Sequence, residues 1–169
     1  MALPRKLKNF NVFNDGNNYV GLVASITLPK LSRKMEEWRG GGMDGPVEID
    51  LGQEVIHLEW TGGGLLDTAL SQYGITSASG ILVRFAGAYQ HDDDGGVDAV
   101  EVVVRGRHKE IDFGDAKTGE NTEHKYTTTC SYYKLVINGV TKIEIDLLNF
   151  VFIVDGKDRL AEQRRAIGL

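Results

Sequence analysis

Apolar and polar residues alternate with a period of two over most of this chain, and no other feature constrains its fold as strongly. Successive side chains of a β-strand point to opposite faces, so this pattern is typical of strands with one buried and one exposed face. Nine segments follow it: 10–13, 19–28, 47–51, 55–60, 81–90, 97–111, 126–137, 140–147 and 150–154. The alternation therefore predicts a mainly β protein.

Turn-forming residues between these segments indicate which strands pair. Asn138-Gly139 joins two strand segments, and both residues tolerate the positive φ of a type I′ turn. The polar turn 92–96 predicts antiparallel pairing of the segments on either side of it. Asn14-Asp15-Gly16-Asn17 predicts a first hairpin, between the two segments nearest the N-terminus.

Two helices are expected in addition. Apolar residues at helical spacing predict a short helix over 65–73, with Asp67 in its first turn and Gly74 at its end. Residues 158–167 read as a terminal helix that Gly168 caps. Residues 1–169 are therefore expected to form a single domain, an antiparallel β-barrel or sandwich with one short helix between strands and a C-terminal helix. A chain of this length buries about 70% of its unfolded surface, which supports a real core.

A long Gly-tipped loop interrupts the strand pattern at about 29–46. It is longer than most connections inside a compact domain, and such insertions are usually functional or disordered. Leu31, Met35, Trp38 and Met43 supply regularly placed apolar residues that a solvated linker would lack. The loop is therefore interpreted as an arm that contacts another protein.

Composition excludes several function classes. The formal net charge is −5. Tight binding to nucleic acid is therefore not expected, because clustered Lys and Arg drive binding to phosphate. The single cysteine, Cys130, cannot form an intramolecular disulfide and is expected to be a buried thiol. No apolar run approaches the roughly twenty residues of a membrane helix, so no membrane contact is expected.

The search for catalytic or cofactor chemistry yields no convincing site. Residues 40–45 match the dinucleotide fingerprint spacing, but a strand follows them where that motif requires a helix. His91-Asp92-Asp93-Asp94 is better explained as a hairpin turn than as a calcium loop. The remaining histidines are scattered without zinc-site spacing. Neither an enzyme nor a cofactor or metal site is predicted.

Several motifs, taken together and in order, resemble a known family. They are the arm, Leu3–Leu7, Arg84–Tyr89, Arg105–Asp112, Glu144–Asp146 and Ile167–Leu169. The chain resembles the major tail tube protein family of contractile-tailed bacteriophages, to which R-type pyocin tubes are closely related. The resemblance covers essentially the whole chain.

The resemblance implies a homo-oligomer in which hexameric rings stack into the inner tube of a contractile tail. It further implies a virion-tail location after assembly in the host cytoplasm, and contacts with the tail sheath, tape-measure and baseplate proteins. DNA would pass through the tube without specific binding. Because Lys and Arg contacts would retard the DNA, carboxylates are expected to outnumber basic groups on the lumenal face. The candidates are Asp98, Glu101, Glu144 and Asp146.

Two further sets of contact residues are expected from the same reading. The arm would contact an adjacent protomer or the next ring through Lys30, Leu31, Arg33, Lys34, Met35, Glu36, Glu37, Trp38, Arg39, Met43 and Asp44. Candidate ring or sheath contacts are Arg105, Arg107, Lys109, Arg159, Arg164 and Arg165. In the competing interpretation the arm folds back onto its own barrel and Trp38 belongs to the core.

Two other functions stay open from the sequence. One is the inner tube protein of a type VI secretion-like system, which shares the ring architecture but exports effectors. The other is a monomeric β-barrel that binds a small ligand.

Overall fold

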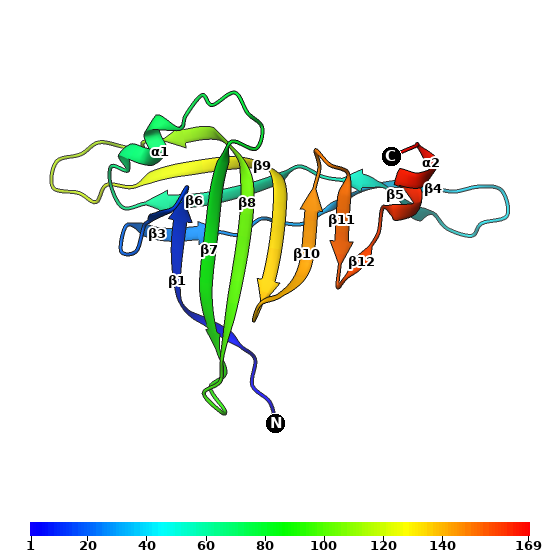
Figure 1. Cartoon of the computed structure of the whole chain (residues 1–169), viewed down its shortest axis with the longest axis horizontal. Coiled ribbons are helices and arrows are strands. Elements are labelled where there is room, and N and C mark those ends of the chain that lie inside the picture. The colour runs from blue at the N-terminus through cyan, green and yellow to red at the C-terminus, as the bar shows by residue number, and fades with distance from the viewer.

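The computed structural model describes all residues, 1–169, and consists of strands with two short helices (Figure 1). The strands are β1 (Lys6–Asn14), β2 (Asn17–Asn18), β3 (Val23–Thr27), β4 (Arg33–Trp38), β5 (Val47–Gln53), β6 (Ile56–Gly62), β7 (Ile81–Gln90), β8 (Val97–Asp112), β9 (His124–Ile137), β10 (Val140–Asp146), β11 (Val151–Val154) and β12 (Lys157–Asp158). The helices are α1 (Asp67–Ser71) and α2 (Ala161–Ala166). Neither helix is long enough to cross a bilayer.

Ten strands form one antiparallel sheet, whose main path runs β12-β11-β10-β9-β8-β7-β1-β2. Strand β9 carries a branch, because its first half pairs with β6 and its second half pairs with β10. Strand β3 then extends the branch by pairing with β6. The sheet therefore folds into two layers, and β8 and β9 contribute to both of them (Figure 1).

The long strands bend between the layers at a bulge. The register of β8 against β9 shifts between Arg105 and Gly106. A Cβ at Gly106 would overlap the backbone carbonyl of Thr129, so only glycine permits this approach of β8 to β9. Strands that change layer through such bulges are typical of orthogonally packed sheets.

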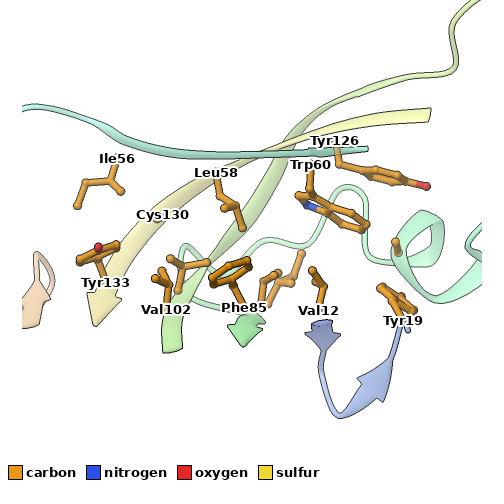
Figure 2. Close-up of a cluster of buried hydrophobic side chains, with 14 of the residues drawn as sticks. Val12, Tyr19, Ile56, Leu58, Trp60, Phe85, Val102, Tyr126, Cys130 and Tyr133 are labelled. Carbon is orange, nitrogen blue, oxygen red and sulfur yellow. The ribbon is translucent and has the colours of Figure 1, made fainter. Parts of the chain in front are cut away.

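The core lies between the two layers (Figure 2). One layer contributes Phe85 and Val104 from β7 and β8, and the other contributes Trp60 and Tyr126 from β6 and β9. The Trp60 and Tyr126 rings stack with their centroids 4.2 Å apart. Helix α1 closes one end of this core, where Ala69 is fully buried.

Most sequence predictions of elements are confirmed. Strands β7 and β8 pair antiparallel across the polar turn. Asn138 and Gly139 adopt φ values of 49° and 79° at the β9–β10 turn, as a type I′ turn requires. Both helices exist but are shorter than expected. Helix α2 starts late because Lys157 and Asp158 pair with β11 instead.

The predicted first hairpin is wrong in its second strand. After β1 the chain turns at Asp15-Gly16, and only the two residues of β2 pair back onto β1, whose other edge pairs with β7. The chain then turns again at Gly21, where φ is +77°, and β3 joins β6 in the other layer. The turn forms at Asp15-Gly16 as its residues predict, but the local sequence does not determine which layer the next strand enters.

Candidate assembly surfaces

The Gly-tipped segment is a β-hairpin rather than an irregular loop. Strands β4 and β5 form a separate two-stranded sheet, which extends near α2 at one end of the molecule's long axis (Figure 1). Residues 39–46 form its tip. We call strands β4 and β5 with this tip the hairpin arm. Its second strand includes residues that the sequence had assigned to the body of the sheet.

The register of the hairpin arm defines its two faces. Trp38 lies opposite Val47, and Glu36 lies opposite Ile49. Residues directly opposite on an antiparallel pair share a face. Trp38 and Met35 are three residues apart on one strand, so they lie on opposite faces. The two predicted apolar anchors would therefore serve different surfaces of the arm.

One face of the hairpin arm exposes four large apolar side chains, with Glu36 beside them. Trp38, Val47, Ile49 and Leu51 have exposed fractions of 57%, 52%, 45% and 51%. Trp38 therefore does not belong to the core, and the folded-back arrangement of the arm is excluded. Sequence reasoning missed Val47, Ile49 and Leu51 as part of this surface. Their alternation was visible, but their pairing with β4 was not.

The opposite face of the hairpin arm is acidic. Met35 lies opposite Asp50, and Glu37 lies opposite Glu48. Glu37 and Glu48 make no ion pair within the protomer. The other predicted contact residues of this region are also exposed, whichever face they lie on: Lys30, Leu31, Lys34, Met35, Glu36 and Asp44.

Arg33 anchors the base of the hairpin arm to the body of the protein. Its Nε donates to both carboxylate oxygens of Asp50, at 2.9 and 3.2 Å. These hydrogen bonds hold the pKa of Asp50 below its ordinary value. The Arg33 guanidinium also lies 4.9 Å from the ring centroid of Phe152. Arg33 is thus engaged within the protomer.

The tip of the hairpin arm is organised by Met43. Its carbonyl accepts a hydrogen bond from Arg39 Nε at 3.2 Å. Its sulfur lies 3.1 Å from the backbone nitrogen of Gly40. The tip leads into β5, so the glycine-rich spacing does not open a helix and forms no dinucleotide site.

The four candidate lumenal carboxylates do not share one face. Glu101, Glu144 and Asp146 lie on the side of the sheet that points away from the core. Asp98 lies on the other side of β8, three residues from Glu101. Its carboxylate accepts hydrogen bonds from Arg5 at 2.9 Å and Asn138 at 2.7 Å, and these bonds lower its pKa.

The face that carries Glu101, Glu144 and Asp146 is balanced in charge. Arg84 donates to Glu101 at 3.0 Å. Tyr132 donates to Glu144 at 2.9 Å, and burial together with this carboxylate raises the Tyr132 pKa to about 12. The same outward positions also carry Arg84, Arg105 and Lys134, so three cations stand beside three carboxylates.

The basic residues predicted for ring or sheath contacts fall into two groups. Arg105, Arg107 and Lys109 are exposed along β8, and Arg107 donates to the Thr76 carbonyl at 3.1 Å. Arg105 shares the outward face with Glu101, Glu144 and Asp146, whereas Asp98 lies on the other side of the sheet. Lys109 makes no ion pair within the protomer.

The second basic group surrounds α2. Arg164 pairs with Asp158 and donates to the Phe150 carbonyl at 2.9 Å, so it fastens α2 to β12 and to the residue that precedes β11. Arg165 pairs with Glu162 at 2.9 Å on the exposed side of the helix. Arg159 borders the cavity at the base of the hairpin arm.

His91, Asp93 and Asp94 come together at the β7–β8 turn. Asp93 accepts a hydrogen bond from the Leu3 backbone nitrogen at 3.1 Å, and Asp94 accepts one from Gly96 at 2.8 Å. The carboxylates thus organise the turn and hold the N-terminus. This geometry supports the hairpin-turn interpretation over a calcium loop.

A protein-family model and two phage proteins match this chain over most or all of its length. Residues 4–168 match the model of the phage tail tube protein FII family. The tail tube protein of Escherichia phage P2 is 48% identical over 172 residues, covering 100% of both chains. The major tail tube protein of Serratia phage KSP20 is 40% identical, covering 94% of this chain and 92% of the relative.

Solved structures show the same fold at much lower sequence identity. The sheath/tube terminator of an extracellular contractile injection system has a TM-score of 0.59 at 10% identity, covering 80% of this chain and 96% of that one. The tube-terminating cap of the anti-feeding prophage has a TM-score of 0.60 at 10% identity, covering 80% and 94%.

Proposed function

The chain belongs to the phage tail tube protein FII family, and we propose that it builds the inner tube of a contractile tail by stacking hexameric rings of identical protomers. It is a structural protein of the virion tail, as its relatives are, and not an enzyme. Residues 1–169 would act together as one tube domain.

The open apolar face of the hairpin arm carries this proposal. Trp38, Val47, Ile49 and Leu51 expose a contiguous apolar surface on a segment that projects from the main sheet. Contiguous apolar patches on a soluble chain mark interaction sites. Tryptophan is also enriched among the residues that dominate binding energy. A second copy of the same chain is the partner that a tube requires.

The open edges of the main sheet support assembly in the same way. Strand β2 covers only the last residues of β1, so the first half of β1 leaves one edge unpaired. The two-residue β12 covers β11 at the opposite edge. Exposed edges promote uncontrolled pairing unless they are covered or closed. Closing the sheets of six protomers into a ring would satisfy these backbone groups.

We further propose that the outward face bearing Glu101, Glu144 and Asp146 lines the lumen. The three carboxylates offset Arg84, Arg105 and Lys134 on this face, and Arg84 is paired with Glu101, so these residues present no net positive charge to phosphate. DNA would therefore pass without being held. The tail sheath, tape-measure and baseplate proteins are the further partners that a contractile tail implies.

The type VI secretion-like alternative has weaker support. The relatives that match over the full length are phage tail tube proteins. The injection-system structures share only the fold, because their identity to this chain is 10%. A monomeric ligand-binding barrel would leave the open face of the hairpin arm without a role.

Negative-stain microscopy of the purified protein tests the proposal. Rings or tubes of uniform bore are expected, together with concentration-dependent assembly in sedimentation velocity. A protein that stays monomeric at all concentrations and salt conditions would contradict ring assembly and favour the binding-module alternative.

A further inference from the structure

A second surface of the protomer has the shape and chemistry to receive the hairpin arm. A pocket of about 410 Å³ lies where the end of α1 meets the end of β8. Its lining residues are Leu70, Tyr73, Lys109, Glu110, Ile111 and Phe113. An apolar cavity of about 150 Å³ already accommodates benzene. This pocket is therefore large enough for an indole ring.

We propose that Trp38 of one protomer inserts into this pocket on the next protomer of the assembly, with Glu36 beside Lys109. This inference rests on the ring assembly proposed above and names the surface that the hairpin arm contacts. Tyr73 and Phe113, which are 61% and 55% exposed, form the aromatic walls. Aromatic rings pack favourably against an indole in offset or edge-to-face geometry.

Charge complementarity supports this pairing. Glu36 and Trp38 lie on the same face of β4, two residues and therefore roughly 7 Å apart. Lys109 lines the pocket, as Glu110 does, and makes no ion pair within its own protomer. A carboxylate at this distance from the inserted indole would meet that lysine. The pair would select the correct orientation of the arm.

The positions of the two surfaces also fit a closed assembly. The hairpin arm lies toward one end of the long axis, and α1 with the adjoining end of β8 lies toward the other (Figure 1). A contact between two different surfaces of identical chains is heterologous, and it generates a ring when the rotation closes. A contact between two hairpin arms would instead be isologous and would stop at a dimer.

Charge reversal provides the first test. Glu36→Lys and Lys109→Glu should each raise the protein concentration needed for assembly by about tenfold, the effect of losing one favourable charge pair. The double variant should restore assembly to within about threefold of the wild type. Glu37→Lys is the matched control, because Glu37 lies on the opposite face of the arm. Combining it with Lys109→Glu should give no rescue.

Cross-linking provides a second, independent test. Val47 lies opposite Trp38 and next to Glu48, whose side chain points to the other face. A Val47→Cys/Tyr73→Cys double variant, treated in the assembled state with a short thiol cross-linker, should give a ladder of covalent oligomers. Glu48→Cys/Tyr73→Cys should not. Cys130 is buried and adds no background.

The outcomes separate this inference from the tube function. Tubes that form normally, without charge rescue and without the Val47–Tyr73 ladder, would overturn the pocket assignment and leave tube assembly intact. Covalent dimers from Val47→Cys alone would show arm-to-arm contact and would also overturn it. A wild-type chain that forms neither rings nor tubes would overturn both.

Discussion

His108 Nε2 lies 3.0 Å from Gln72 Oε1, and this contact joins the long strand β8 to the residue that ends α1. The other ring nitrogen, Nδ1, lies 3.0 Å from the Thr128 hydroxyl. That hydroxyl in turn accepts from Trp60 Nε1 at 3.4 Å. Because Gln72 Oε1 can only accept, Nε2 carries the proton and Thr128 donates to Nδ1.

Acidification should destabilise the fold through His108. Burial lowers its pKa from the ordinary 6.5 to about 4, with nearby Asp15 opposing the shift. Between these values the unfolded chain binds a proton that the folded chain does not, so stability falls as pH falls from about 6.5 to 4. The full shift corresponds to roughly 3 kcal/mol. Urea unfolding at pH 7 and pH 4.5 measures the loss.

The control for this pH effect is His108→Gln, which keeps a side chain able to donate and accept hydrogen bonds but cannot titrate. Its stability should fall less steeply over the same pH range. An unchanged slope in this variant would assign the acid sensitivity to other groups.

Gln72→Ala should loosen the attachment of α1. Gln72 Oε1 accepts from Asn14 at 2.9 Å, and its amide nitrogen donates to Asn14 and Asp15. Truncation leaves buried Asn14 and His108 without these partners, which costs about 2 kcal/mol. Hydrogen exchange should accelerate over α1. Ser71→Ala is the control, because the Ser71 hydroxyl bonds only to Thr68 within the helix.

Gly106→Ala should be among the most damaging single substitutions. The new methyl group would overlap the Thr129 carbonyl at the bend of β8 and β9. Separating the strands should cost about 3 kcal/mol or prevent folding. Gly41→Ala at the tip of the arm meets open space and should leave the melting temperature within about 2 °C of the wild type. Thermal unfolding by circular dichroism compares the two.

The two tryptophans should respond in opposite ways to truncation. Trp60 is 1% exposed in the core, so Trp60→Ala should destabilise the protomer by about 4 kcal/mol. Trp38 is 57% exposed, so Trp38→Ala should leave the unfolding free energy within about 0.5 kcal/mol while abolishing tube formation. Urea unfolding and electron microscopy measure these effects. Intact tubes from Trp38→Ala would remove the main support for the arm.

The Cys130 thiol should be unreactive in the folded protein. Burial raises its pKa to about 12, so almost no thiolate is present at neutral pH. A thiol reagent should modify it only upon unfolding, at a rate that rises with urea concentration. Rapid modification under native conditions would show that β9 opens locally.

The elements and the family were accessible from the sequence because their signals are local. Alternation identified β7, β8, β9 and β10 within a few residues, and the Asn138-Gly139 turn defined one hairpin. Motifs distributed along the whole chain indicated a tail tube protein. The sequence also singled out the segment around Trp38 as an arm, because its length and apolar content are local properties too.

Other features depend on contacts between distant segments, and only the tertiary structure decided them. The pairing of β4 with β5 placed Trp38 with Val47 and Ile49 and put Met35 on the other face. The local sequence indicated a loop with regularly placed apolar residues, and it did not reveal that the loop's two sides pair as strands. The choice of β6 as the partner of β3 likewise depended on the two-layer core. Strand register is set by such packing, since a shift of one residue moves every side chain to the opposite face.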